Sequence, residues 1–137
     1  MKSSPRLLTL PVLAFPFLFG LAHAQEAPRT FLSKAEIEKT VIGKSMTHKE
    51  VATGTVRKWD LRSDGRIYYN NISNTNKVAS GSGTWDLKDD GALCVHWSRV
   101  ADGSGSCSYF SNDGDTLVRT DTNTAAARII TRIEKFE

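Results

Sequence analysis

The pattern of apolar and polar positions changes once along the chain, from a helical period to a period of two. The helical part is FLSKAEIEKTVIGK, residues 31–44, in which Ile37 and Val41 lie four positions apart on one helix face. Ser33 and Glu36 match the Ser-x-x-Glu capping box that begins many helices. The segment therefore predicts one short N-terminal helix, which needs an apolar partner surface to be stable.

After this helix, apolar positions alternate with polar ones in short runs separated by Gly, Asp, Asn and Ser clusters, which is the pattern of β-strands. No segment between the runs is long enough for a helical crossover, so antiparallel pairing is expected. The sequence predicts an all-β fold: an antiparallel barrel or strongly bent sheet of about eight short strands. The expected strand segments are SMTH (45–48), TVRKWDL (55–61), RIYYN (66–70), VASGSGTWDL (78–87), ALCVHW (92–97), SCSYF (106–110), TLVRT (116–120) and RIITRIE (128–134).

The alternation also predicts which side chains face inward. In residues 92–97, Cys94 and His96 fall on the outer face, opposite the apolar residues. Gly81 and Gly83 have no side chain to pack, which favours the strong bend that closure of a small barrel requires. Aromatic residues gather on the predicted inner face: Trp59, Tyr69, Trp85 and Trp97.

Two near copies of an acidic segment, WDLRSDG at 59–65 and WDLKDDG at 85–91, raise the question of a calcium loop. Such a loop needs an oxygen ligand at its third position, which Arg62 and Lys88 occupy here. The copies are 26 residues apart, closer than the roughly 40 of a propeller blade. Hairpin turns explain the pattern better, at Asp64-Gly65, Asp90-Gly91 and a third site, Asp113-Gly114.

Residues 1–24 have the features of a cleaved signal peptide. A basic start, MKSSPR, precedes an apolar run, and the small-x-small sequence Ala22-His23-Ala24 follows it. The run contains Pro11 and Pro16 and is short for a membrane span. We therefore expect cleavage before Gln25, no membrane anchor in the mature form, and an exported protein that is periplasmic or secreted.

Removal of the predicted signal peptide changes the charge balance. The whole chain has 18 Lys and Arg against 15 Asp and Glu, and the signal carries two of the bases, which leaves a net charge of +1. The remaining charges alternate in sign without a phosphate-binding stripe, so nucleic acid is not an expected partner. The remaining length suits one domain. We expect a flexible lead-in over residues 25–31 and a single β-rich domain over 32–137.

The two cysteines, Cys94 and Cys107, can form one intramolecular disulfide, which an exported environment favours. Such a loop is expected to stabilise the fold by about 3 kcal/mol. The alternative is that the thiols bind a metal or act as nucleophiles. Cys94 and His96 share a strand face, yet one further histidine does not complete a metal site. No metal site and no cofactor are therefore predicted.

Catalytic motifs are not apparent, because the chain has no Gly-x-Ser-x-Gly elbow, phosphate-binding loop or His-Glu-x-x-His sequence. No catalytic residue is assigned. A small hydrolase that uses His48 or His96 with a nearby acid is the least favoured function. The inner-face aromatic residues have two interpretations: they fill a small core, or they line a cavity for an apolar ligand.

The segment SGSGTWDLKDDGALCVHW, residues 80–97, combines a Gly-x-Trp strand, a turn and a Leu-x-Val strand, with a second cysteine downstream. In this it resembles small exported bacterial proteins of unknown function whose barrels are regarded as lipocalin-like. The resemblance is most specific from Ser80 to Cys107 and implies a lipocalin-like β-barrel. Lipocalins carry Gly-x-Trp near the start of their first strand, whereas here it lies in mid-chain, so no binding residue is transferred.

The function expected from these observations is an exported, non-catalytic binding module. Its partner would be a small apolar or amphipathic ligand, or an envelope component such as an envelope protein. The alternative is a protein-interaction or inhibitor module that acts through exposed loops such as NNISNTNK (70–77) or SRVADGSGS (98–106). A continuous inner cavity favours the first function, and an apolar loop surface favours the second.

Overall fold

A computed structural model describes residues 28–72, 80–98 and 105–137. The predicted signal peptide and most of the two loops proposed for protein interaction lie outside these residues. The described residues form one helix and eight strands: α1 (Lys34–Thr40), β1 (Ser45–Glu50), β2 (Val56–Leu61), β3 (Arg66–Asn71), β4 (Ser80–Leu87), β5 (Leu93–Trp97), β6 (Ser106–Asp113), β7 (Thr116–Thr120) and β8 (Ile129–Phe136).

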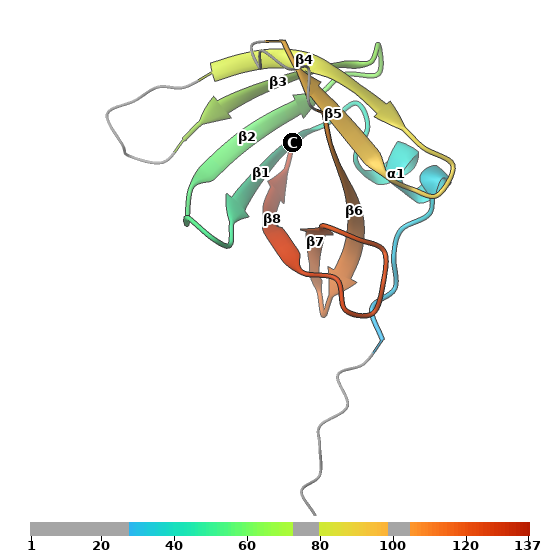
Figure 1. Ribbon diagram of the computed structural model, residues 1–137. Helices are drawn as coiled ribbons and strands as arrows, with labels where there is room; N and C mark the ends of the chain where they lie inside the picture. The colour runs from blue at the N-terminus through green and yellow to red at the C-terminus, as the bar shows by residue number, and fades with distance from the viewer. Residues whose placement is uncertain (1–27, 73–79, 99–104) are drawn as a thin grey trace, which may run out of the picture.

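The eight strands form a closed antiparallel barrel. Each strand pairs with the next in sequence, and β1 also pairs with β8 (Figure 1). The predicted fold class is thus confirmed, and this up-and-down order fits the lipocalin-like expectation. Within the described part of the chain, no helix is both long and apolar enough to cross a membrane.

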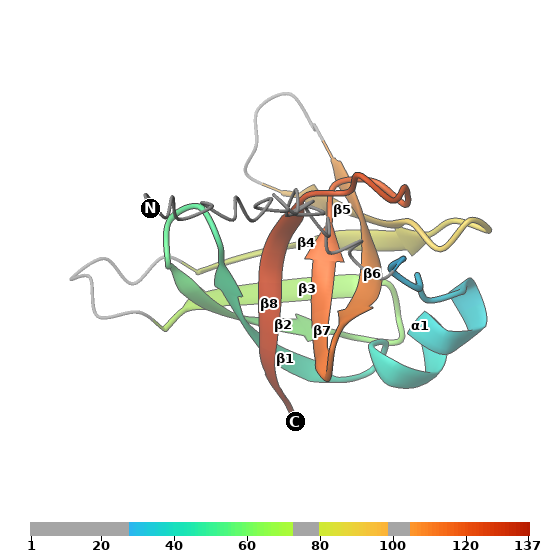
Figure 2. The ribbon, with the colours of Figure 1, turned by 90° about the horizontal axis from the view of Figure 1, so that it is seen from below.

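Helix α1 has the predicted capping box. The Ser33 hydroxyl accepts a hydrogen bond from the backbone N–H of Glu36, and the Glu36 carboxylate accepts one from the backbone N–H of Ser33. Ile37 and Val41 are fully buried in the barrel core. Gly43 follows at φ 77°, which glycine adopts readily. The helix lies beside the β4–β5 turn and closes one end of the barrel (Figures 1 and 2).

The repeated acidic segments end in hairpin turns, as predicted. Gly65, Gly91 and Gly114 have φ values of 85°, 84° and 62°, in the region that favours glycine. In the first of these turns, the Asp64 carboxylate accepts a hydrogen bond from the backbone N–H of Arg66 at 3.0 Å. The segments therefore shape the ends of hairpins.

The two halves of the barrel interior differ. Apolar side chains fill the half next to α1, and residues two positions further along the same strands face the other half. In β1, Met46 belongs to the core and His48 lies beyond it; in β8, Ile133 and Thr131 show the same relation. The other buried core residues are Ile37, Val41, Trp59, Leu61, Ile67, Leu93, Val95 and Phe110.

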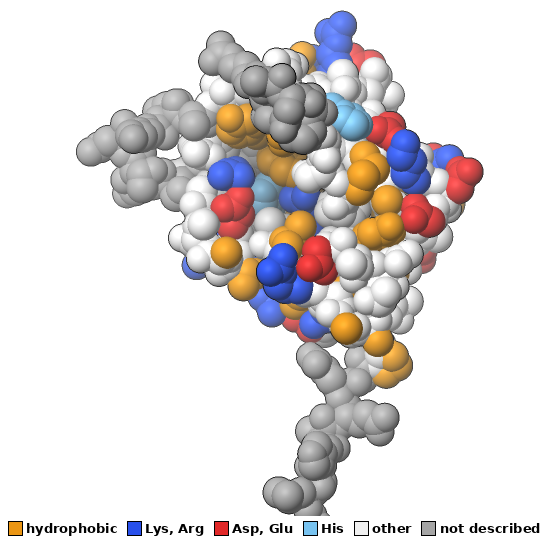
Figure 3. Space-filling model, in the orientation of Figure 1, with side chains coloured by type: hydrophobic (Ala, Val, Ile, Leu, Met, Phe, Trp, Pro, Cys, Tyr) orange, Lys and Arg blue, Asp and Glu red, His pale blue; other side chains and the backbone are white. Residues whose placement is uncertain are grey.

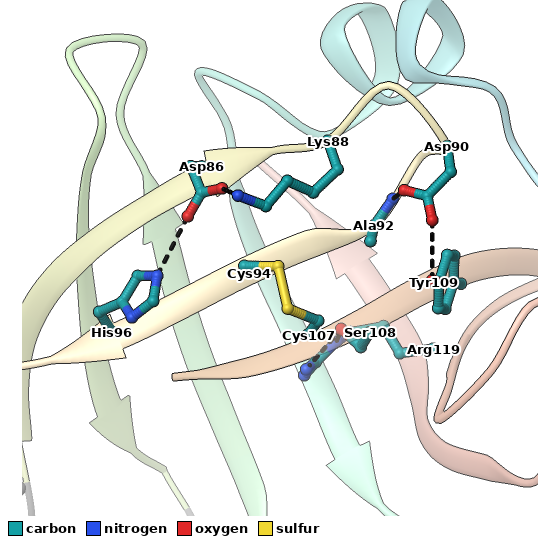
Figure 4. The surroundings of a disulfide bond; sticks show 10 residues. All are labelled: Asp86, Lys88, Asp90, Ala92, Cys94, His96, Cys107, Ser108, Tyr109 and Arg119. Carbon is teal, nitrogen blue, oxygen red and sulfur yellow. Dashed lines mark hydrogen bonds and ion pairs between the residues drawn. A yellow bond between two sulfur atoms is a disulfide. The ribbon is translucent and has the colours of Figure 1, made fainter. Parts of the chain in front are cut away.

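Strands β5 and β6 pair over a short register of three residue pairs centred on Cys94 and Cys107. The predicted disulfide joins these two residues and crosses this register (Figure 4). Beyond this register, β6 is hydrogen-bonded to the segment that precedes α1 instead of to β5. The backbone N–H of Leu32 donates to the Phe110 carbonyl at 2.8 Å. The disulfide is consistent with an oxidising, exported environment.

Candidate ligand-binding cavity

The half of the barrel away from α1 contains a cavity of about 820 Å³, and each of the eight strands contributes to its lining. This volume lies within the roughly 300–1,000 Å³ typical of small-molecule sites. Figure 3 shows a hollow on the surface, in which basic side chains and a histidine lie among hydrophobic ones. The barrel is therefore only partly filled by its own side chains.

Three of the four aromatic residues predicted as ligand contacts line the cavity: Trp59, Tyr69 and Trp97. We call these three the aromatic wall. The ring centroids of Trp59 and Trp97 are 5.6 Å apart and those of Tyr69 and Trp97 are 4.9 Å apart, both edge to face. Gly81 makes room for this arrangement, because a Cβ there would lie 2.4 Å from the Tyr69 ring. The aromatic wall is thus continuous across neighbouring strands.

The fourth predicted residue, Trp85, does not line the cavity. It pairs with Val95 and packs against the core, and its indole N–H donates to the Arg62 carbonyl at 2.9 Å. By register Trp85 and Trp97 share the inner face, but Trp85 lies toward the filled end of the barrel. Ligand binding by these aromatic residues stays a prediction, and the geometry favours the aromatic wall over Trp85.

Arg119 of β7 places a charge between the core and the cavity. Its side chain is 5% exposed, and its Nε and Nη2 groups donate to the Ser108 hydroxyl at 3.1 and 3.0 Å. The guanidinium carbon lies 4.1 Å from the Trp59 ring centroid, a cation–π contact. Burial lowers the pKa of Arg119 to about 9, while Glu50 acts to raise it and Arg57 to lower it. The guanidinium is therefore charged at neutral pH.

His48 of β1 lines the cavity next to this charge. Its imidazole is 1% exposed and its ring centroid lies 4.8 Å from that of Trp59. Burial and, to a smaller extent, the charges of Arg119 and Arg57 together lower the pKa of His48 to about 3. The ring is therefore neutral at neutral pH, with one nitrogen that donates and one that accepts. Its Nδ1 atom and the Thr131 hydroxyl are both buried without a hydrogen-bond partner.

The other charged groups of the cavity have partners. Arg57 forms an ion pair with Glu50, and its Nε donates to the side-chain amide oxygen (Oδ1) of Asn71 at 3.0 Å. The Arg128 guanidinium lies 3.4 Å from the Asp121 carboxylate. Among the described lining residues, three arginines face one carboxylate, that of Glu50. The lining therefore carries a net positive charge.

The polar part of the cavity was not predicted, apart from His48, which was considered only for catalysis. The sequence does contain a signal for these polar residues. Each one lies an even number of positions along its strand from an inward apolar residue, so the alternation places its side chain on the inner face. Arg57 lies two positions from Trp59, and Arg119 lies two positions from Leu117. Other inward polar residues of this kind are Glu50, Asn71 and Thr131.

His96 lies on the outer face of the barrel, near the disulfide (Figure 4). Its Nε2 is 3.1 Å from the Asp86 carboxylate, and its side chain is 48% exposed. Among the described residues, no carboxylate bonds to His48, and no three His, Cys, Asp or Glu side chains are grouped to hold a metal ion. The histidine–carboxylate pair thus lies outside the cavity, and the histidine inside it has no acid partner.

Comparison with known proteins identifies a family. The model of a family described as protein of unknown function (DUF995) matches residues 13–125, which is most of the chain. The matched span includes the aromatic wall, His48 and Arg119. No curated protein and no solved structure matches the chain.

Proposed function

The chain belongs to the DUF995 family of proteins of unknown function, and we propose that its barrel is a non-catalytic binding module for one small amphipathic molecule. The observation that carries the proposal is the half-empty interior, with a cavity of about 820 Å³ beside a well-filled core. Protein interiors are normally packed without voids much larger than a water molecule. Side chains that served stability alone would fill this space.

The chemistry of the lining supports an amphipathic ligand. The aromatic wall offers apolar contact area, as most small-molecule sites do, and a few polar groups lie at defined places around it. At the rim, Val51 is 56% exposed and lines the cavity, so an apolar surface continues toward solvent. A molecule with an apolar body and one polar end fits this distribution.

We place this binding module outside the cytoplasm. The disulfide between Cys94 and Cys107 and the predicted signal peptide support export. In that location the protein would carry or sense a small molecule of the cell envelope or its surroundings. Mass spectrometry of the protein recovered from the periplasm or medium tests this, because we expect loss of residues 1–24 and two hydrogens fewer than the reduced chain.

Titration with N-phenyl-1-naphthylamine, a neutral dye that fluoresces in apolar surroundings, tests the binding function. We expect saturable binding of one dye per chain. Ser106 pairs with the inward Val95 and lines the cavity. Ser106→Phe should place a ring in the space that the dye occupies, and this steric block should weaken dye binding by about tenfold or more, which corresponds to about 1.4 kcal/mol.

Ser80→Phe is the matched control. Ser80 is exposed on β4 and pairs with the exposed Asn70, on the face opposite Tyr69 and Gly81. The same ring on the outer face should leave dye affinity unchanged. Absence of saturable binding by the folded wild-type protein, or equal affinities for the two phenylalanine variants, would refute the proposed cavity site.

A further inference from the structure

The Arg119 charge has no acidic partner in the part of the chain that the structure describes. Among the described residues, its hydrogen bonds are those to the Ser108 hydroxyl and its cation–π contact is with the Trp59 ring. The Glu50 carboxylate is near enough to raise the pKa of Arg119 but forms no ion pair with it. Charged groups in protein interiors are normally paired, because removal from water is costly. Glu50 also lines the cavity, but its carboxylate is engaged by Arg57. A buried guanidinium that faces an empty space is therefore suited to an anion from outside the chain.

Two neutral groups add to this arrangement. The His48 Nδ1 atom and the Thr131 hydroxyl are buried in the cavity lining without hydrogen-bond partners. Thr131 is paired with Arg119 in the β7–β8 register, so the hydroxyl and the guanidinium share one face of neighbouring strands. A hydroxyl and a neutral imidazole can each donate to an oxygen atom. The polar groups at this end of the cavity are thus donors arranged around one charge.

The aromatic wall determines the chemistry of the rest of the ligand. The aromatic wall runs from Trp59, next to Arg119, through Trp97 to Tyr69. A phosphate or other small inorganic anion would leave this apolar surface uncovered. A molecule with an apolar body would cover it while its head reaches the guanidinium.

We propose that the ligand is an amphipathic carboxylate, held with its head group against Arg119, His48 and Thr131 and its apolar body along the aromatic wall. This inference rests on the proposed function and names its ligand class. Arg119 recognises the charge, and the two neutral donors fix the second oxygen. The ligand supplies a counter-charge in direct contact with the guanidinium, which the described residues do not.

Competition between decanoate and 1-decanol for the cavity-bound N-phenyl-1-naphthylamine tests the head group. At neutral pH we expect decanoate to displace the dye at a concentration lower than decanol by about tenfold or more, as charge-assisted hydrogen bonds in a buried site allow. Arg119→Met should bring the two competitors to equal affinity while dye and decanol still bind. Arg119→Lys should restore part of the preference.

Arg132→Met is the matched control, because Arg132 lies on the outer surface of β8, is 48% exposed and pairs with Asp113. This substitution also removes one positive charge, but outside the cavity, and the variant should keep the preference for decanoate over decanol. Equal affinity of the wild-type protein for both competitors, or a preference that persists in Arg119→Met, would overturn the carboxylate inference while leaving the binding function intact. Failure of the dye and both competitors to bind would overturn the binding function itself.

A measurement on the wild-type protein covers the case in which Arg119→Met does not fold. The carboxyl ¹³C resonance of bound, labelled decanoate should titrate with a pKa below that of the free acid, because a nearby positive charge favours the ionised form. A bound carboxyl whose pKa is unchanged or raised would contradict contact with the guanidinium.

Discussion

The buried His48 makes the stability of the barrel depend on pH in a range where most carboxylates stay ionised. The pKa of His48 is lowered from 6.5 to about 3, chiefly by burial, with the charges of Arg119 and Arg57 acting in the same direction. Below pH 6.5 the unfolded chain binds a proton at this residue that the folded chain does not bind. Acidification therefore favours unfolding, and the stability associated with neutral His48 is fully present only above pH 6.5.

The size of the effect follows from the two pKa values. Each tenfold difference in proton affinity corresponds to about 1.4 kcal/mol, so the whole window from pH 6.5 to about 3 amounts to roughly 5 kcal/mol. Between pH 7 and pH 5 alone, the free energy of unfolding should fall by about 2 kcal/mol. A change of this size is a large part of the stability of a small domain.

His48→Phe isolates this contribution, because phenylalanine keeps a ring beside Trp59 and cannot bind a proton. Urea unfolding followed by tryptophan fluorescence at pH 7, 6 and 5 measures the free energy of unfolding of both proteins. We expect the loss of about 2 kcal/mol in the wild-type protein to be nearly absent from the variant. His96→Gln, which removes an exposed histidine, should keep the wild-type loss. Equal pH dependence of the wild type and His48→Phe would refute a buried neutral His48.

Four further predictions concern the cavity and the disulfide. The double substitution Arg119→Met with Ser108→Ala should raise the free energy of unfolding of the ligand-free protein by about 1–3 kcal/mol, because it removes a buried charge together with its hydroxyl partner; a lower midpoint in urea at neutral pH would contradict this. Trp97→Leu should weaken binding of N-phenyl-1-naphthylamine by about three- to tenfold through loss of a wall ring. Trp85→Phe should leave the dye affinity within about twofold, and a larger loss would show that the ligand reaches the filled end. Replacement of both Cys94 and Cys107 by serine should lower the free energy of unfolding by about 3 kcal/mol, measured against the oxidised wild type under the same conditions, and an unchanged midpoint would show that the disulfide adds nothing to stability.

Local signals in the sequence were sufficient for the elements of this fold. The Ser33–Glu36 capping box depends on residues three positions apart, and each Asp-Gly turn depends on adjacent ones. The period of two predicted the inner faces, and the phase of the alternation placed Trp59 and Trp97 there. The same short-range rules separated hairpin turns from a calcium loop, because Lys88 stands where an oxygen ligand is needed.

The cavity could not be predicted in this way, because it depends on the sum of inward side chains from eight strands. Whether an inward residue fills the core or lines the cavity depends on its height along the barrel axis. That height is determined by the strand register and by closure of the barrel. Trp85 and Trp97 show this, since both face inward but only Trp97 lies at the empty end. Gly81 leaves space that the Tyr69 ring of the neighbouring strand fills, whereas the short side chains of Ser82, Ser106 and Thr131 leave space that stays open, and no single strand reveals the difference.

The sequence by itself determined the helix cap, the turns and the alternation, because each depends on residues close together in the chain. It also determined the disulfide pairing, because two cysteines allow only one intramolecular bond. Only the tertiary structure decided that Arg119, His48 and Thr131 meet at one end of a cavity. These residues come from β7, β1 and β8, far apart in sequence, and barrel closure brings the first and last strands together. That Arg119 forms no ion pair with a carboxylate among the described residues becomes recognisable only when the strands around it are placed in space.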